Sequence, residues 1–331
     1  MSRSKKAPPS ADAIALLGWA GVQWHRGAIP TALGMIEPYL RHAGAWQSPR
    51  MPDLIERIPS VWARDLDPAE RALSWCHLID KHAAYLGACS SLELGIDHPQ
   101  RVDRPAFERS TPGYWRIEAS RVPWPLRLPD PLGRDVPTLR RPDGQWWLTT
   151  PTIELAIEHD IDFEIREAWL WPRHRRLLRP FYERCRGARM ALERVLSAGP
   201  PERRRKAAVA AVGALKASYA ALLGGGLAAI KNRKRSPRPP WYRPDWRHAI
   251  IAKSRANLIR NQLYWAAHGV HVAAIYNDGC YVLSDQPGAP SSVNLDRSLG
   301  AYSLKASWPA ASMIGRRGRV VPSLAWGEDD G

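Results

Sequence analysis

Residues 246–284 carry the pattern that most restricts the fold of this chain. A helical segment, 246–267, is followed by two apolar runs, VHVAAIY (270–276) and CYVLS (280–284), with only Asn277-Asp278-Gly279 between them. An Asp-Gly step between two apolar runs is a strong short-range hairpin signal. The chain must therefore contain an antiparallel sheet, with Asp278 at the tip of one of its hairpins.

The remaining periodic segments predict an α+β protein. Residues 11–74 are expected to be helical, with Asp12 as a cap and Pro68 opening a helix at its first position. A short apolar strand, 75–79, ends at Asp80. The other expected elements are strands at 113–119 and 145–150, a helix from Pro151, and two long helices, 174–198 and 202–223, joined by AGPP as a helical hairpin.

The charge balance points to a polyanionic partner. The 331 residues include 48 Lys plus Arg against 32 Asp plus Glu, which gives a net charge of +16. Nucleic acid is the first candidate, and the 16 Trp and 10 Tyr suit base stacking as well as an ordinary core. The chain has no run of about 18 uninterrupted apolar residues and no convincing signal peptide, so we expect a cytoplasmic protein with no membrane partner.

Four cysteines (Cys76, Cys89, Cys185, Cys280) lie far apart in the sequence and form no CxxC pair. This spacing predicts reduced, mostly buried thiols rather than a zinc site or a disulfide framework. The segment KNRKRSPRPPWYRP (231–244) fits neither a helix nor a central strand. It is either a solvated loop or a phosphate contact through Lys231, Arg233, Lys234 and Arg235.

Two acids stand out by their positions. Asp80 ends an apolar strand and Asp278 lies at a hairpin tip. Together they could hold Mg²⁺, which prefers oxygen ligands and often binds one or two carboxylates plus substrate phosphates. A lone strand-end Asp is more often a turn or cap residue, and Asp278-Gly279 has a sufficient explanation as a turn.

From about 70 to 310, the order of segments resembles the palm and fingers of family B DNA polymerases, especially the compact protein-primed type. The first palm motif of that family is an Asp followed by a Tyr five residues later, and this chain has Asp80 and Tyr85. The resemblance implies that Asp80 ligates Mg²⁺ or Mn²⁺. It implies that Tyr85 stacks near the incoming sugar and excludes a 2′-hydroxyl, the group that distinguishes RNA from DNA substrates.

Two further motifs match incompletely. The fingers motif has Lys216 and Gly224 in frame, whereas Ala220 and Leu223 replace its Asn and Tyr. The third motif, Tyr-x-Asp-Thr-Asp, appears as Tyr276-Asn277-Asp278-Gly279-Cys280. Cys280 thus replaces a principal metal ligand, and a thiol is a poor ligand for Mg²⁺.

The resemblance implies an antiparallel palm sheet, helical-hairpin fingers and a small helical N-terminal region. The expected divisions are a helical region of unknown role (1–70), a first palm segment (71–173), fingers helices (174–230), a second palm segment (231–310) and a flexible basic, then acidic, tail (311–331). Lys216, with Arg204, Lys206 and Gly224, would bind the nucleotide, and Lys305 would approach the primer end. No editing exonuclease is expected.

Three functions remain open on this sequence. The first is a DNA-directed nucleotidyltransferase that uses dNTPs in the replication of a phage, plasmid or other mobile or linear element, with a priming or replication protein as a candidate partner. The second is an inactive polymerase-fold protein that binds primer–template or single-stranded DNA. The third is an unrelated basic DNA-binding regulator. Asp80, Asp278 and Lys216 are the candidate catalytic residues, and Asp80 and Asp278 the candidate metal ligands.

Overall fold

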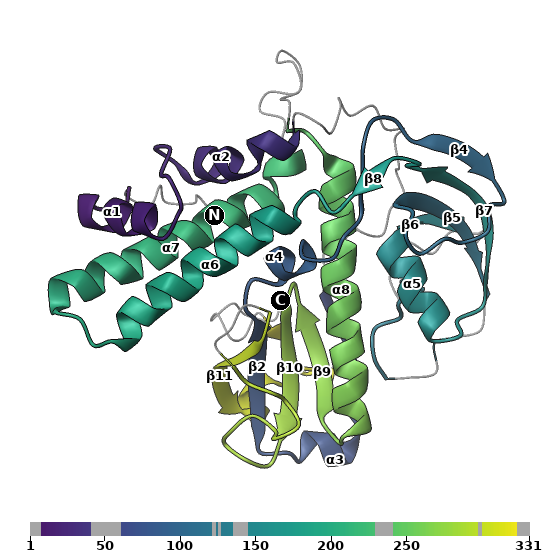
Figure 1. The fold of residues 1–331 in the computed structure, drawn as a ribbon. Helices are drawn as coiled ribbons and strands as arrows, with labels where there is room; N and C mark the ends of the chain where they lie inside the picture. Colours follow the sequence, from purple (N-terminus) through teal and green to yellow (C-terminus); the bar gives the residue numbers. More distant parts are fainter. Residues whose placement is uncertain are drawn as a thin grey trace.

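The structure is a computed structural model that describes residues 8–40, 61–120, 124, 127–134, 145–228, 241–296 and 300–322. Two antiparallel sheets lie on either side of one long helix, α8 (Pro244–Ala267), and a helical lobe projects from the same core (Figure 1). The expected α+β class with antiparallel sheets is confirmed.

The larger sheet has five antiparallel strands. Their order across the sheet is β1 (Val61–Ala63), β9 (His271–Tyr276), β10 (Gly279–Ser284), β2 (Trp75–Lys81) and β11 (Tyr302–Pro309). Strand side chains alternate between faces. Cys280 and Val282 pack toward Leu258 and Trp265 of α8, whereas Tyr281 and Leu283 pack on the other face with α9 (Ala310–Met313). The sheet is therefore covered on both faces.

The smaller sheet has four strands, in the order β4 (Gln100–Asp103), β7 (Phe163–Leu170), β5 (Gly113–Ala119) and β6 (Gln145–Thr149). One face buries Trp115, Ile117 and Leu148 against helix α5 (Thr150–Glu158). A two-stranded ladder of β3 (Leu94–Gly95) and β8 (His174–Arg175) links this sheet to the rest of the chain.

The helical lobe is a hairpin of α6 (Arg179–Ser197) and α7 (Glu202–Gly224), reversed at Gly199 with φ +63°. Helices α1 (Ala11–Trp19) and α2 (Ala28–Leu40) pack against α7, while the short α4 (Ala84–Ala88) lies between the hairpin and the large sheet (Figure 1). A 3-10 turn, Gly226–Ala228, follows α7.

One helical segment of the described residues, Glu202–Ala228, is long and apolar enough to cross a membrane by length and composition. A core helix of a soluble protein passes the same test, and Ala211, Leu215 and Leu222 of α7 are buried in the core of the helical lobe.

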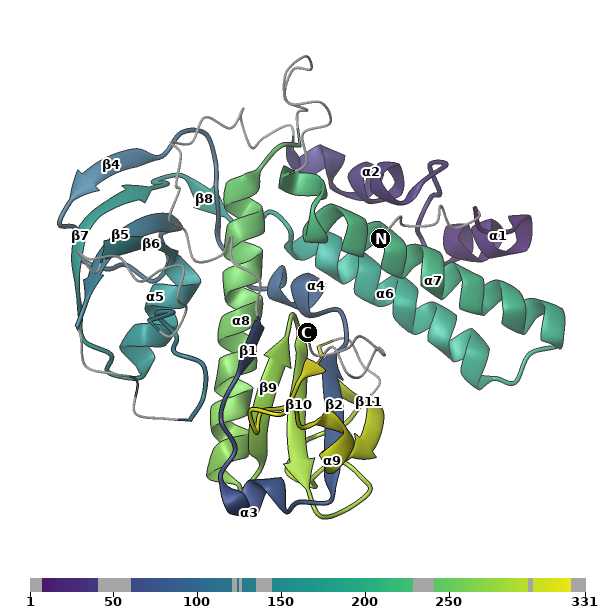
Figure 2. The same cartoon turned by 180° about the vertical axis from the view of Figure 1, so that it is seen from behind.

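The structure corrects three expectations. Residues 1–70 are not wholly helical, because β1 joins the edge of the large sheet beside β9 (Figure 2). Ser10, not Asp12, caps α1, since its side chain accepts a hydrogen bond from the backbone N–H of Ala13. The region 311–322 is not a flexible tail, because Met313 and Val320 are buried under the large sheet.

Residues 71–173, expected to form one segment, contribute to more than one sheet. Only β2 of this range lies in the large sheet, whereas β4–β7 form the separate smaller one. The hairpin begins at Arg179 rather than 174, because residues 174–175 form β8. The other expected strands and helices lie within a few residues of their predicted positions.

Candidate functional site

The register of β2 and β10 brings Asp80 and Asp278 to one end of the large sheet. Gly279, the first residue of β10, pairs directly with Asp80. Asn277 and Asp278 form the two-residue turn, with Asn277 at φ 59°. Glycine suits this position, since a Cβ on residue 279 would lie 2.9 Å from the Leu78 side chain and would have to displace it. Two carboxylates nearly two hundred residues apart in the sequence therefore become neighbours.

The two carboxylates interact electrostatically. Burial raises the pKa of Asp278 above its usual range, and the negative charge of Asp80 raises it further. Lys216 and Lys305 oppose this increase in pKa. Lys305, on the neighbouring strand β11, places its Nζ 3.4 Å from Oδ2 of Asp80. The sheet and the helical hairpin thus converge on one site with two acids and two lysines.

Tyr85 faces the same site from α4. It lines a small cavity of about 10 Å³ together with Asp278 and with Ser254 and Arg255 of α8. Burial raises the pKa of the Tyr85 hydroxyl, and the charge of Asp278 adds to this effect. Ala83 adopts a left-handed conformation, φ 52°, immediately before α4 and so sets the direction in which that helix leaves β2.

Four further polar residues around the site were not predicted from the sequence: His82, Arg189, Arg247 and Arg255. Burial and the charges of Lys305 and Arg189 lower the pKa of His82. The charges of Arg255 and Arg247 oppose the rise in the pKa of Tyr85. These two arginines lie eight residues apart on α8, a spacing that places them on one helical face and could have identified them.

Cys280 does not face the carboxylates. It is fully buried against α8, where Nε2 of Gln262 lies 3.5 Å from its Sγ. Burial raises the pKa of its thiol to about 12. A neutral thiol in an apolar core is not a metal ligand. Among the described residues, no group of three or more His, Cys, Asp or Glu side chains could hold a metal ion.

The structure does not bring every predicted nucleotide-binding residue to the site. Arg204 and Lys206 lie at the outer end of α7, where the hairpin points away from the sheets (Figures 1 and 2). Lys206 is ten residues before Lys216, about 15 Å along the helix axis, and pairs with Glu202 at 3.5 Å. Gly224 ends α7, and its carbonyl accepts a hydrogen bond from Nε of Arg247.

The structure describes one of the five predicted DNA contacts. Lys305 lies beside Asp80, whereas Lys231, Arg233, Lys234 and Arg235 fall outside the described residues.

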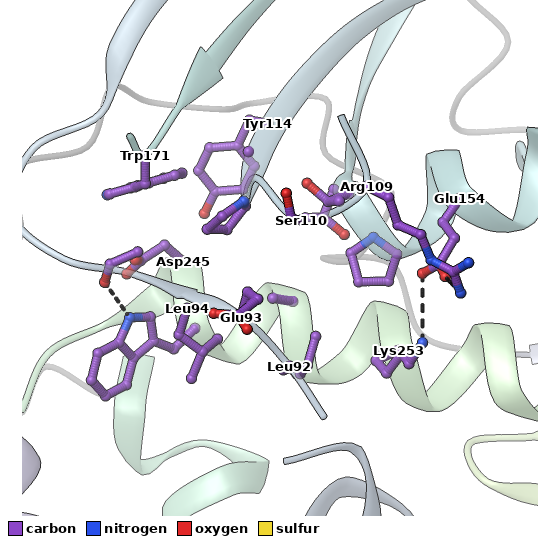
Figure 3. A pocket seen from close by; sticks show the side chains of 18 of the residues that line it. Leu92, Glu93, Leu94, Arg109, Ser110, Tyr114, Glu154, Trp171, Asp245 and Lys253 are labelled. Carbon is purple, nitrogen blue, oxygen red and sulfur yellow. Dashed lines mark hydrogen bonds and ion pairs between the residues drawn. The ribbon is translucent and has the colours of Figure 1, made fainter. Parts of the chain in front are cut away.

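A larger cavity, of about 590 Å³, lies between α8 and the smaller sheet (Figure 3). Lys253 contributes to it from α8 and lies 3.5 Å from a Glu154 carboxylate oxygen. Glu154 also pairs with Arg109, and Asp245 with the buried Arg243. Glu154 and Asp245 are thus held in ion pairs at the wall of this cavity, whereas the pKa of Asp278 is raised by a neighbouring carboxylate.

No protein-family model matches the chain. No curated protein matches it either. Among solved structures, Phi29 DNA polymerase complexed with single-stranded DNA aligns with a TM-score of 0.49 and 12% identity, over 90% of this chain and 55% of that one. The same polymerase with primer-template DNA gives 0.49 and 13%, with 90% and 55% coverage. The chain spans about half the length of these polymerases, and likeness at this level assigns neither family nor activity.

Proposed function

We propose that the chain is a polymerase-like nucleotidyltransferase that acts on DNA. One observation carries the proposal: Asp80 and Asp278 meet at one end of the large sheet, and Lys216 and Lys305 face them from two other elements. Carboxylates placed this close together, with the pKa of one raised by burial and by the other's charge, are frequent at functional sites.

The donor set fits a hard divalent cation. Asp80 and Asp278 supply oxygen ligands at one point, which leaves other coordination positions for substrate phosphates. These two residues would hold Mg²⁺ or Mn²⁺. Such an ion would polarise the phosphoryl group and stabilise its developing negative charge.

The surrounding residues have distinct roles in this proposal. Lys216 and Lys305 neutralise phosphate charge beside the carboxylates, because catalysis of phosphoryl transfer consists mainly of positioning and charge stabilisation. Tyr85, half-buried next to Asp278, limits the space available at the sugar of the incoming nucleotide.

In this proposal the large sheet is the palm and the α6–α7 hairpin the fingers. DNA is the template partner and dNTPs the substrates, in cytoplasmic replication of a phage, plasmid or other mobile or linear element. The net charge of +16 supports binding to DNA.

Primer extension tests the activity. The full chain is incubated with primer–template DNA, dNTPs and either Mg²⁺ or Mn²⁺. We expect extension that Asp80→Ala reduces by about a thousandfold or more, because a lost metal interaction of several kcal/mol has that effect. Asp285→Ala is the matched control, since Asp285 is exposed beyond the opposite end of β10. Equal loss in both variants, or no extension with either ion, refutes the enzymatic proposal.

A second candidate is a DNA-binding protein of the same fold without turnover. The burial of Cys280 favours it, because the site then has two carboxylates and, among the residues that the structure describes, no third ligand from β10. If this function is correct, the affinity for DNA falls steeply as the salt concentration rises, because phosphate contacts release counterions. The same affinity is retained in Asp80→Ala. DNA binding that is insensitive to salt would contradict both candidates.

A further inference from the structure

Helix α1 has an apolar outer face. Ala11, Ile14, Ala15, Gly18 and Trp19 recur at positions i, i+3, i+4, i+7 and i+8, and all five are exposed. Trp19 is 63% and Ile14 36% exposed. No residue that the structure describes covers this face.

The opposite face of the same helix is also apolar. Ala13 and Leu17 are fully buried against the helical lobe, where α1 packs on α7. A surface helix of a soluble protein ordinarily has charged or polar residues on its outer face, and a helix that is apolar all round is normally buried. We therefore expect the exposed face of α1 to bind a second apolar surface.

Exposed cations adjoin this helix. Asp12, the acidic residue of α1, pairs with Arg203 at the start of α7 at 2.8 Å. The side chains of Arg203, Lys206 and Arg205 are 86%, 77% and 65% exposed. An apolar strip and a group of basic residues thus occur together at one end of the helical lobe.

We propose that this face of α1 docks on the surface of an anionic phospholipid bilayer. A membrane-surface helix combines buried apolar side chains with basic residues that attract anionic lipid, and Trp is a preferred residue at the membrane–water interface. Ile14 and Trp19 would enter the interface while the basic residues contact lipid phosphates. Docking of this kind needs no membrane-spanning segment, so this proposal replaces the expectation of no membrane partner, which rested on the lack of a long apolar run.

Charge and polarity argue against two other occupants, a second copy of the chain and DNA. A second copy of the chain would bring two molecules of net charge +16 and two groups of exposed arginines together. DNA would pair with the cations but would leave the five apolar residues without a favourable partner, since binding to phosphate is electrostatic. An anionic bilayer satisfies both the apolar strip and the cations.

Vesicle co-sedimentation of the full chain tests the proposal. Vesicles of phosphatidylcholine mixed with phosphatidylserine should bind the chain, and pure phosphatidylcholine vesicles should bind it far more weakly. Trp19→Ala should weaken binding to the mixed vesicles by about tenfold, the effect of losing one large buried apolar side chain. Tyr264→Ala is the matched control, since Tyr264 is 54% exposed on α8 and should not affect vesicle binding.

Several results would overturn the proposal. These are no binding to the mixed vesicles, equal binding to both vesicle types, or equal effects of Trp19→Ala and Tyr264→Ala. A dimer in size-exclusion chromatography that Trp19→Ala dissociates would assign the face to a second copy. A selective loss of DNA affinity in Trp19→Ala would assign it to DNA.

Ile14→Gln, with an unchanged melting temperature, provides a second variant for the vesicle, dimer and DNA measurements. Primer extension by Trp19→Ala should equal that of the unaltered chain. The membrane-docking proposal and the nucleotidyltransferase proposal can therefore fail independently of each other.

Discussion

Strand β9 has a carboxylate near each end, and the two carboxylates have opposite surroundings: one is paired with a cation and the other lies beside a second carboxylate. At its first residue, His271, the strand adjoins Glu70, which is 4% exposed. Arg64 donates two hydrogen bonds to Glu70, at 2.7 and 2.6 Å, and the backbone N–H of Asp67 donates a third. At its other end, β9 leads into Asp278, whose neighbours include the carboxylate Asp80.

The two pKa values move in opposite directions. Burial favours the neutral form of both acids, but the hydrogen bonds from Arg64 and Asp67 lower the pKa of Glu70 to about 2. Asp278 lacks so strong a set of donors, and both burial and Asp80 raise its pKa. A carboxylate with its own cation stabilises the fold, whereas two carboxylates placed together favour a bound cation. One strand therefore separates a structural end of the sheet from the candidate active end.

The largest expected effect lies at the structural end. Arg64→Ala leaves Glu70 buried without its main partner, and breaking a buried pair in this way costs about 3–5 kcal/mol of stability. Lys305→Ala at the other end removes a partly exposed contact with Asp80 and should cost no more than about 1 kcal/mol. Urea unfolding of both variants measures the contrast, and equal losses would contradict the division of the sheet into two kinds of end.

The pH dependence of the structural end has a definite sign. The pKa of Glu70 lies below its ordinary value of 4.5, so its contribution to stability is complete above about 4.5 and is lost as the pH falls toward about 2. Arg64→Ala should flatten this region of the stability profile. If Arg64→Ala leaves the loss of stability between about pH 4.5 and 2 unchanged, other carboxylates cause that loss.

Cys280→Asp tests whether the active end can accept a third carboxylate. The side chain at this position points into the core against Gln262, so an aspartate there would be buried away from Asp80 and Asp278. We expect a loss of about 3 kcal/mol and no gain in Mn²⁺ affinity. Cys280→Ser is the matched control with a smaller polar change. A folded Cys280→Asp protein with tighter Mn²⁺ binding would show that β10 can turn this position toward the site.

Local sequence signals predicted much of the scaffold. The Asn277-Asp278-Gly279 turn between apolar runs predicted the hairpin of β9 and β10, and AGPP between two helical segments predicted the α6–α7 hairpin. The strand-end position of Asp80 and the hairpin position of Asp278 allowed a shared site. Their actual meeting depends on the pairing of Gly279 with Asp80, a contact between segments far apart in the sequence.

Other features had no local signal. Val61–Ala63 is too short to show alternation, and it becomes a strand only because β9 offers an open edge. Strand alternation predicts that the Cys280 and Val282 side chains share one face of the sheet, but the face of the sheet that α8 covers depends on long-range packing. The resemblance implies a nucleotide contact for Arg204 and Lys206 as well as Lys216, but α7 carries all three, and ten or more residues of helix hold the first two away from Lys216.

A smaller effect, of opposite sign, is expected at the active end. Asp278→Asn removes a partly buried charge beside Asp80, so it should stabilise the protein by about 0.5–2 kcal/mol at neutral pH while abolishing primer extension. The raised pKa of Asp278 lowers stability as the pH rises from its ordinary value of 3.8 through the native value. The gain from Asp278→Asn should therefore vanish below pH 3.8. Thermal unfolding at several pH values measures this change in stability. If Asp278→Asn is less stable than the unaltered chain, Asp278 stabilises the fold as Glu70 does.

The smallest expected change is a shift in one titration. Asp80→Asn removes the like charge that raises the pKa of Asp278, so this pKa should fall while the larger contribution from burial remains. Carboxyl NMR of the two proteins gives the pKa of Asp278 directly. Asp285→Asn, beyond the opposite end of β10, should leave that pKa unchanged. Because charge coupling requires proximity, an Asp278 titration that is indifferent to Asp80→Asn would separate the two acids, and the proposed shared cation site would then have no basis.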